Sequence, residues 1–303
     1  MKMKRSTIIY ALVTLALTAC SNDENLDNLN SPVEIRLSSG LEVQEVGTRA
    51  ATDIFNNRFD NGETVDVFIN EKTEGTATTT YPQPLQYTTA ANGALNLVDE
   101  TNRPYFPTSG NGVEIYAVYP SGIGSIFTVE TDQSSDVNYK KSDLMQTKTS
   151  VDRPQKDPIA LRFEHKLSKV IVTLISGAGS PDLDGATIKL KNAKTQVAFT
   201  AATGTVTDKQ DSQTSDITVG TATSGNLSRA AILPPQTLQQ DFVEITLKNG
   251  GVLTGSLNNG QPVLEKGNAY KYTITVNLTG LGITAEIEPW DDRYEFEGSA
   301  GMQ

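Results

Sequence analysis

Residues 270–278 read Tyr-Lys-Tyr-Thr-Ile-Thr-Val-Asn-Leu, and apolar and polar side chains alternate through this stretch without a break. Successive side chains of a β-strand point to opposite faces, so the alternation predicts a strand with one buried face and one face in water. The same period of two recurs at Val33-Glu-Ile-Arg-Leu37 and within residues 65–69, 113–119 and 243–247. Half-buried strands of this kind are typical of antiparallel sheets.

The rest of the chain predicts two β-domains in tandem. Stretches rich in Thr, Gly, Asn and Pro, at residues 71–84, 101–112 and 130–158, are expected to be loops between the strands. A length of 303 residues favours two domains over one. We therefore predict an all-β chain of two antiparallel β-sandwich domains, over residues 50–157 and 158–303.

The composition excludes several classes of function. There are 36 acidic residues against 25 basic ones, for a net charge of −11, and an acidic surface does not release the counterions that drive nucleic-acid binding. With one Cys and one His, the chain holds neither a disulfide framework nor a zinc cluster. The sequence also lacks a phosphate-binding loop and a Gly-x-Ser-x-Gly motif. We predict no catalytic residues, no metal site, no cofactor and no nucleic-acid partner, and we do not expect an enzyme.

Three groups of residues could carry chemistry, and for each we prefer a structural role. His165 precedes a strong strand, where packing needs one partner but catalysis would need an identifiable nucleophile. Asp182-Leu-Asp184 lacks the further carboxylates of a calcium loop and is expected to form a turn. Trp290 beside Asp291 and Asp292 suggests a sugar platform, but at the end of a strand it is expected to close the core.

The N-terminus has the features of an export signal. Three basic residues among the first five precede an apolar run at residues 8–17, which ends in Leu17-Thr-Ala-Cys20. The run is shorter than the roughly 20 apolar residues that cross a bilayer. The only Cys stands at the cleavage point, which resembles a bacterial lipobox. That resemblance implies a signal peptide at residues 1–19, acylation of Cys20 and attachment of the precursor to the outer membrane through lipid. The alternative is an ordinary secretory signal with an accidental Cys.

Residues 20–49 are expected to form a tether followed by a first strand. Residues 21–31 are polar and predict a flexible tether. The strand at residues 33–37 follows it. Gly47-Thr-Arg-Ala-Ala-Thr-Asp53 is small, polar and without periodicity, which predicts an exposed loop that a protease can reach.

Five segments together resemble the fimbrillin family of Bacteroidales type V pili. They are Val113-Glu-Ile-Tyr-Ala-Val-Tyr-Pro120, Phe163-Glu-His-Lys-Leu-Ser-Lys-Val-Ile-Val172, Ile232-Leu-Pro-Pro-Gln236, Lys266-Gly-Asn-Ala-Tyr-Lys-Tyr-Thr-Ile-Thr-Val276 and Ile287-Glu-Pro-Trp290. Their order and spacing over residues 20–297 carry the resemblance. It implies two transthyretin-like β-sandwich domains in a subunit of an adhesive fimbria at the cell surface. The subunit would be made as an outer-membrane lipoprotein and would polymerise with other fimbrial subunits.

The resemblance also implies how such a subunit matures. The family's precursors are cut after an Arg by a trypsin-like protease, and Arg49 before Ala50 matches that position. In the uncut chain, Val33, Ile35 and Leu37 are expected to fill a groove in the N-terminal domain. After cleavage, a C-terminal strand of the next subunit would take their place.

Two pieces of the tail at residues 284–303 are candidates for that donor strand. Residues 284–290 contain Ile287. Residues 293–297 read Arg-Tyr-Glu-Phe-Glu, which places Tyr294 and Phe296 on one face of an extended segment.

The alternatives left open are a fimbrial tip or anchor subunit and a surface glycan-binding lipoprotein. The glycan-binding protein would need an aromatic platform, for which the chain offers Tyr81, Tyr87, Tyr105 and Tyr116. A host or bacterial surface receptor is the remaining class of partner, and the sequence does not identify it.

Overall fold

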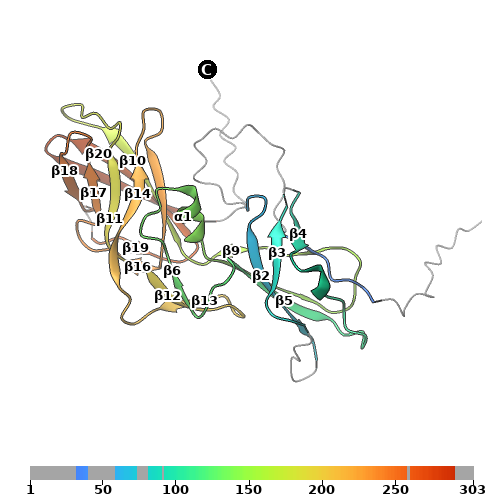
Figure 1. Ribbon diagram of the computed structural model, residues 1–303. Coiled ribbons are helices and arrows are strands. Elements are labelled where there is room, and N and C mark those ends of the chain that lie inside the picture. The colour runs from blue at the N-terminus through green and yellow to red at the C-terminus, as the bar shows by residue number, and fades with distance from the viewer. Residues whose placement is uncertain (1–31, 40–58, 74–80, 91, 258–259, 291–303) are drawn as a thin grey trace, which may run out of the picture. The chain divides into compact units, whose positions relative to one another are not determined.

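The structure is a computed structural model that describes residues 32–39, 59–73, 81–90, 92–257 and 260–290 (Figure 1). From Val33 onward the described residues form one compact unit, built almost entirely of β-strands. The prediction of an all-β fold is therefore confirmed. In the part of the chain that the structure describes, no helix is both long enough and apolar enough to cross a membrane.

The first part of the fold is one eight-stranded sheet in the order β8-β1-β4-β3-β2-β5-β7-β9. Its strands are β1 (Leu37–Ser38), β2 (Thr64–Glu71), β3 (Leu85–Thr89), β4 (Ala94–Leu97), β5 (Val113–Tyr119), β7 (Met145–Val151), β8 (Ile159–Ala160) and β9 (Glu164–His165), and the short 3-10 helix η2 (Glu100–Asn102) follows β4. Only residues 161–163 separate β8 from β9 along the chain, although these strands end the sheet on opposite sides. The sheet must therefore curl until its two ends approach each other.

Alternating side chains of β2 and β5 form the centre of this sheet's core. Val65, Val67 and Ile69 are fully buried, and so are Val113 and Ile115. They pack in one cluster with Ile35, Leu37, Leu85, Tyr87, Leu95, Phe106, Ala117, Tyr119, Met145, Ile159, Leu161 and Phe163. The strands predicted at residues 65–69 and 113–119 are thus confirmed.

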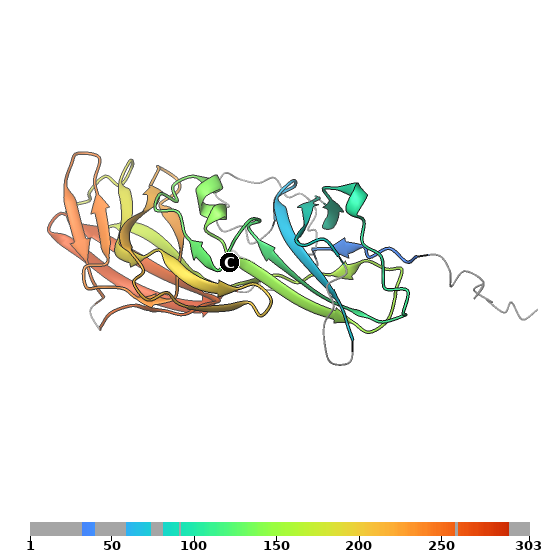
Figure 2. The ribbon, with the colours of Figure 1, turned by 60° about the horizontal axis from the view of Figure 1, so that its bottom comes forward.

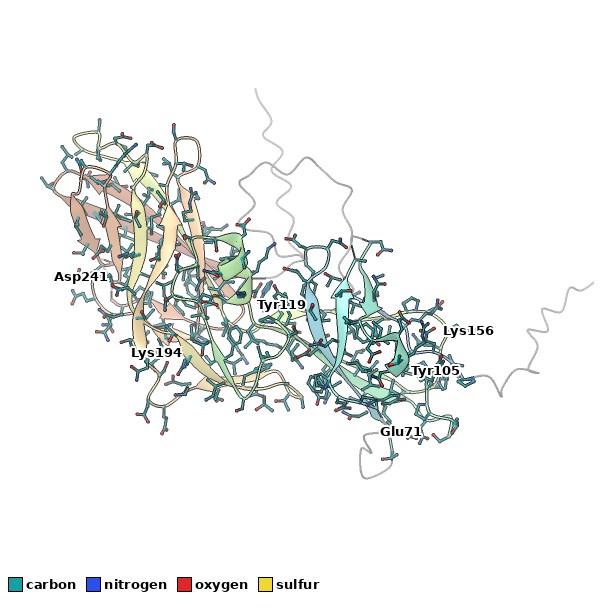
Figure 3. All side chains as sticks on the ribbon, viewed as in Figure 1. Glu71, Tyr105, Tyr119, Lys156, Lys194 and Asp241 are labelled. Atoms are coloured by element: carbon teal, nitrogen blue, oxygen red, sulfur yellow. The ribbon has the colours of Figure 1, made fainter. Side chains whose placement is uncertain are left out.

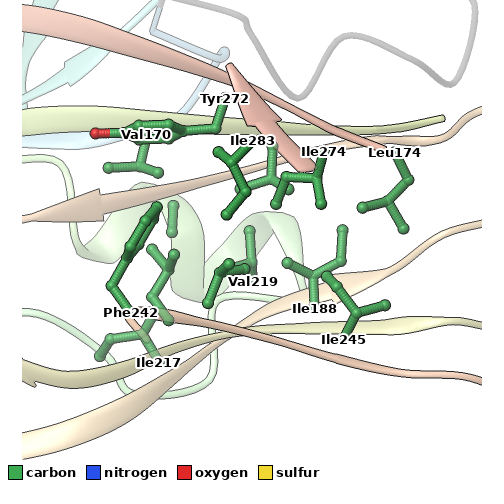
Figure 4. Close-up of a cluster of buried hydrophobic side chains, with 14 of the residues drawn as sticks. Val170, Leu174, Ile188, Ile217, Val219, Phe242, Ile245, Tyr272, Ile274 and Ile283 are labelled. Carbon is green, nitrogen blue, oxygen red and sulfur yellow. The ribbon is translucent and has the colours of Figure 1, made fainter. Parts of the chain in front are cut away.

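The second part of the fold contains two four-stranded sheets with a shared core. One has the order β15-β10-β20-β21 and the other β14-β11-β17-β18. Their strands are β10 (Ser168–Ser176), β11 (Thr187–Lys194), β14 (Thr214–Thr221), β15 (Ser228–Leu233), β17 (Val243–Thr246), β18 (Val252–Gly255), β20 (Asn268–Asn277) and β21 (Gly280–Pro289). Figure 4 shows Tyr272 and Ile274 of β20 facing side chains from β11, β14 and β17 across this core. The burial of Tyr270, Tyr272, Ile274 and Val276 confirms the strand predicted from residues 270–278.

Strand β10 is apolar on both faces because both faces are covered. Val170, Val172 and Leu174 lie in the core between the four-stranded sheets, whereas Ile171 lies in a separate cluster on the opposite face. Side chains from β6 (Ile126–Thr128), α1 (Asp136–Lys141) and β12 (Gln196–Thr200) belong to that second cluster. Strand β13 (Thr205–Asp208) completes a three-stranded sheet with β12 and β6, and β16 (Gln236–Thr237) pairs with β19 (Val263–Leu264).

One stretch expected to be a loop is not a loop throughout. Residues 130–158 contain both α1 and β7. Strand β7 reads Met-Gln-Thr-Lys-Thr-Ser-Val. Its mostly polar side chains resemble those of a loop, but backbone pairing with β5 stabilises the segment as a strand. The turn expected at Asp182-Leu-Asp184 is present, because the Asp182 carboxylate accepts a hydrogen bond of 3.0 Å from the Asp184 backbone N–H.

Sheet pairing crosses the expected domain division between residues 157 and 158 in both directions. Strands β8 and β9 follow the division but belong to the first sheet. Strand β6 precedes it but pairs with β12. The division therefore stays a prediction about folding units and does not coincide with a boundary between sheets.

Candidate functional site

The strand predicted from Val33, Ile35 and Leu37 lies inside the first sheet and not at its edge. Leu37 is opposite Leu95 of β4 on one side, where the strands run antiparallel, and opposite Ile159 of β8 on the other, where they run parallel. Figure 2 shows β1 in blue among the strands of this sheet. We call the space between β4 and β8 that residues 33–39 occupy the strand groove.

Backbone hydrogen bonds hold residues 33–39 along their whole length. On one side, the Ile35 N–H donates to the Pro104 carbonyl (2.9 Å), the Phe106 N–H donates to the Val33 carbonyl (2.8 Å) and the Ser39 N–H donates to the Gly93 carbonyl (2.7 Å). On the other side, the backbone N–H groups of Ile159 and Leu161 donate to the carbonyls of Arg36 and Ser38, each at 2.8 Å. The strand is therefore integrated into the sheet through both of its edges.

Two side chains of this strand point into the core. Ile35 is 2% exposed and Leu37 is 4% exposed, and both belong to the cluster that fills the first sheet. Val33 is half-buried and packs against the same cluster. The alternation of buried and outward side chains agrees with the sequence pattern at residues 33–37.

Polar contacts at the surface also hold residues 33–39 in the strand groove. The Arg103 guanidinium donates to the Glu34 carboxylate at 2.8 Å, and the Arg36 guanidinium donates to the Lys156 carbonyl. Glu34 also forms a β-bridge with Tyr105, and Tyr105 and Lys156 are both labelled in Figure 3. Exposed pairs of this kind contribute at most about 1 kcal/mol each, so the apolar side chains and the backbone pairing dominate.

The structure separates the remaining predicted residues into two groups. Cys20, Arg49, Ala50, Tyr294 and Phe296 lie outside the described residues, and their roles stay predictions. Ile287 lies in β21, where it is opposite Tyr270 of β20 and is 62% exposed.

A second cluster of functional side chains gathers around Trp290. Its indole is 6% exposed and stacks on the His165 imidazole, with ring centroids 3.7 Å apart and an interplanar angle of 10°. The Asp143 carboxylate lies 2.8 Å from Nδ1 of His165, and the Lys169 ammonium lies 5.5 Å from the indole centroid. The structural roles predicted for His165 and Trp290 are confirmed by their burial. Asp143 and Lys169 were not predicted, because their proximity depends on packing between distant segments.

Glu63 is a half-buried carboxyl whose pKa responds to Asp143 of this cluster. One of its oxygens accepts a hydrogen bond of 3.1 Å from the Tyr119 hydroxyl, and the other accepts one of 2.7 Å from the Asp60 backbone N–H. The pKa of Glu63 is raised to about 7, mainly by burial and to a smaller extent by the Asp143 charge, while the Tyr119 hydrogen bond opposes the shift. Burial likewise raises the pKa of Tyr119 above its usual value.

Among the described residues, no group of three His, Cys, Asp or Glu side chains is placed to hold a metal ion. The arrangement at the strand groove holds one extended segment of chain by its backbone and two apolar side chains. Such a site binds a β-strand.

Comparison with known families agrees with this geometry. A model of the family described as fimbrillin-like matches residues 48–290, which is most of the chain. The chain belongs to the fimbrillin-like family. Its place in this family makes it a fimbrial structural protein and not an enzyme.

Three proteins similar to this fimbrillin-like chain come from Bacteroides species. A protein of Bacteroides uniformis named "Putative fimbrium subunit Fim1C" is 26% identical over 303 residues, covering 95% of this chain and 96% of its own length. Crystal structures of a "putative cell adhesion protein" from Bacteroides uniformis and of another from Bacteroides ovatus give TM-scores of 0.67 and 0.65. Each is 21% identical and covers 86% of this chain and 98% of its own. At that identity they show that this fimbrillin shares their fold.

We predict that Glu63 gives this fimbrillin a pH-dependent stability. Because the pKa is raised from 4.5 to about 7 in the folded protein, the folded state binds a proton that the unfolded state has lost in this range. The contribution of Glu63 therefore falls as the pH rises from about 4.5 to 7. Glu63→Gln should flatten the decline of the unfolding free energy across this window, as measured by urea denaturation at several pH values.

The exposed Glu265 provides the matched control, since Glu265→Gln should leave the pH dependence of stability unchanged. Superimposable pH profiles for Glu63→Gln and the wild type would show that Glu63 titrates normally in the folded protein.

Proposed function

We propose that this fimbrillin is a structural subunit of a cell-surface fimbria and that its subunits join by exchanging a β-strand. As a fimbrial subunit, the chain belongs at the cell surface and assembles with other fimbrial subunits. The observation that carries the proposal is the position of residues 33–39, which pair on both sides within the strand groove. Two proteins of similar fold are named as cell adhesion proteins, which supports a role of the fimbria in adhesion.

Cleavage after Arg49 would disconnect the strand in the groove from the rest of the fold. Residues 40–58 join the strand to Phe59, and Arg49 lies within this connection. Removal of residues 33–39 would expose an unpaired edge on both β4 and β8 and uncover the apolar cluster beneath. Unpaired strand edges are templates for another chain. The groove would then accept an extended segment from a second subunit.

Approximate free energies indicate that residues 33–39 stay in the groove because they are covalently connected to the rest of the fold. Burial of Ile35 and Leu37 contributes about 3 to 6 kcal/mol, at about 1.5 to 3 kcal/mol per side chain. Ordering residues 33–39 costs about 7 to 14 kcal/mol, at about 1 to 2 kcal/mol per residue. Backbone hydrogen bonds, at about 0.5 to 1.5 kcal/mol each, offset the difference. The favourable free energies of burial and hydrogen bonding are therefore close to the cost of ordering the strand. A strand that is cut from the fold is then able to exchange with another.

For the incoming strand we propose residues 293–297. Tyr294 and Phe296 lie two residues apart, as Ile35 and Leu37 do, so both pairs present their apolar side chains on one face. The other candidate piece, around Ile287, is already a strand of its own sheet, because β21 pairs with β20 from Gly280 to Pro289. A head-to-tail joint of this type does not close on itself and therefore extends into a filament.

We propose that the precursor reaches the cell surface as a lipoprotein. The sequence supports this through Cys20, the only cysteine, at the end of the expected signal peptide. Lipid at Cys20 would hold the precursor at the outer membrane. A trypsin-like protease that cuts after Arg49 would remove the lipid and the groove strand in one step.

Arg49→Ala should leave a precursor that folds but does not assemble, because its groove stays occupied. N-terminal sequencing of assembled wild-type material is expected to begin at Ala50. Arg58→Ala changes an arginine of the same connecting stretch and should assemble normally. Assembled subunits that still begin at Cys20 would contradict cleavage after Arg49 as a step of assembly and favour an anchor subunit.

Truncation after Asp292 should yield a folded, secreted and processed monomer that no longer polymerises. Phe296→Asp should act similarly, because it places a charge in an apolar groove. Electron microscopy after trypsin treatment measures filament formation. Truncation of residues 298–303 alone is the control and should have little effect, whereas filaments of normal length from the longer truncation would exclude residues 293–303 as the donor.

Cys20→Ala should abolish incorporation of a clickable palmitate analogue and release the precursor from the membrane. Firm anchoring requires more than one acyl chain, so loss of the modified residue removes the attachment entirely. Ser21→Ala is the neighbouring control and should retain the label. Absence of label on the wild-type protein would refute the lipoprotein assignment.

A further inference from the structure

Three of the segments that the sequence analysis singled out converge on Trp290. Residues 163–172 supply His165, which stacks on the indole at 3.7 Å, and Lys169, whose ammonium lies 5.5 Å from its centroid. Residues 266–276 supply the Gly267 carbonyl, which accepts a hydrogen bond of 2.7 Å from the Trp290 N–H. Residues 287–290 supply the tryptophan itself. We call His165, Trp290 and Asp143 together the tail clamp.

The tail clamp includes a strand of the eight-stranded sheet that contains the strand groove, at the other end of the strand order from β1. His165 lies in β9 and is opposite Met145 of β7, so it belongs to the same eight-stranded sheet as β1. The Asp143 carboxylate lies 2.8 Å from Nδ1 of the His165 imidazole. The backbone N–H of Asp143 donates to the Lys140 carbonyl of α1. The last described residue of the chain is therefore packed against the sheet that would accept a neighbour's strand.

Backbone pairing with β20 holds β21 as far as Pro289, and the Lys271 ammonium bonds the Glu288 carboxylate at 2.6 Å, but buried side chains are sparse at this end of the strand. Ile283 is buried, but residues 284–287 are all exposed and Glu288 is only half-buried. The Trp290 side chain, in contrast, is buried, and it immediately precedes residues 291–303. The clamp therefore supplies, at the chain's exit, the side-chain burial that residues 284–287 lack.

Only Asp291 and Asp292 separate Trp290 from the segment proposed as donor. An extended chain spans at most about 3.3 to 3.6 Å per residue, so the donor begins within about 10 Å of the clamp. We infer that the tail clamp is a positioning device for assembly, which fixes the donor's point of exit and thereby holds neighbouring subunits in a short, stiff joint. This inference rests on the proposed strand exchange.

The experiment compares the bending stiffness of assembled filaments. His165→Ala removes the stack, and Trp290→Phe keeps an apolar ring but shortens the contact. Both variants should still be processed and should form filaments whose persistence length, measured by electron microscopy, is at least twofold shorter than in the wild type. Lys248→Ala is the control, because it removes the exposed Lys248–Asp184 ion pair (3.5 Å), neither member of which belongs to the cluster around Trp290, and should leave filament stiffness unchanged.

A peptide-binding measurement distinguishes a clamp that positions the donor strand from a clamp that only supports the structure of the groove. A synthetic peptide of residues 291–303 should bind the processed groove of the His165→Ala and Trp290→Phe subunits within twofold of its affinity for the wild type, each subunit being truncated after Asp292. Loss of peptide binding in the variants would show that the clamp supports the groove, and unchanged filament stiffness would show that it does not position the donor. Either result overturns the inference. A peptide that fails to bind the wild-type groove would instead contradict the strand exchange itself.

Discussion

Backbone pairing of residues 33–39 with two strands at once is the constraint on which the rest of the N-terminal sheet depends. A terminal segment added to a sheet usually covers one edge, and its loss leaves the remaining strands paired. Among the described strands, β8 pairs with β1 alone, and β4 pairs with β1 on the side away from β3. The segment therefore completes the sheet, and no other described strand pairs with β8 in its absence.

In the strand-exchange proposal, this arrangement allows one chain to be first a precursor with an occupied groove and then a polymer subunit. Occupation of the groove hides two strand edges and the apolar cluster around Leu95 and Ile159, so these two edges are not templates for aggregation in the precursor. The two four-stranded sheets are complete in themselves, since their core draws on residues from Val170 to Ile283. In the strand-exchange proposal, only the first sheet changes its partner during assembly.

Sequence periodicity predicted the elements whose two faces differ, such as β20 and the strand containing Ile35 and Leu37. It failed for β7, whose polar residues resemble a loop, because pairing with β5 and not side-chain pattern makes it a strand. The burial of Trp290 could be inferred from its place after a strand. The neighbours Asp143 and Lys169 could not, since they come from segments more than 100 residues away in the chain. Glu63 gave no signal either, as its raised pKa arises from burial and from contacts that only the folded chain creates.

The most direct test of strand exchange is a cysteine cross-link in assembled filaments. Leu95 is the registered partner of Leu37 in the precursor, and cleavage after Arg49 would remove Cys20, the only native thiol. Subunits carrying Leu95→Cys together with Phe296→Cys should form disulfide-linked ladders between neighbours after processing and assembly. Filaments that give no such ladder, while a Leu37→Cys and Leu95→Cys pair remains cross-linked within each assembled subunit, would show that the original strand never leaves the groove.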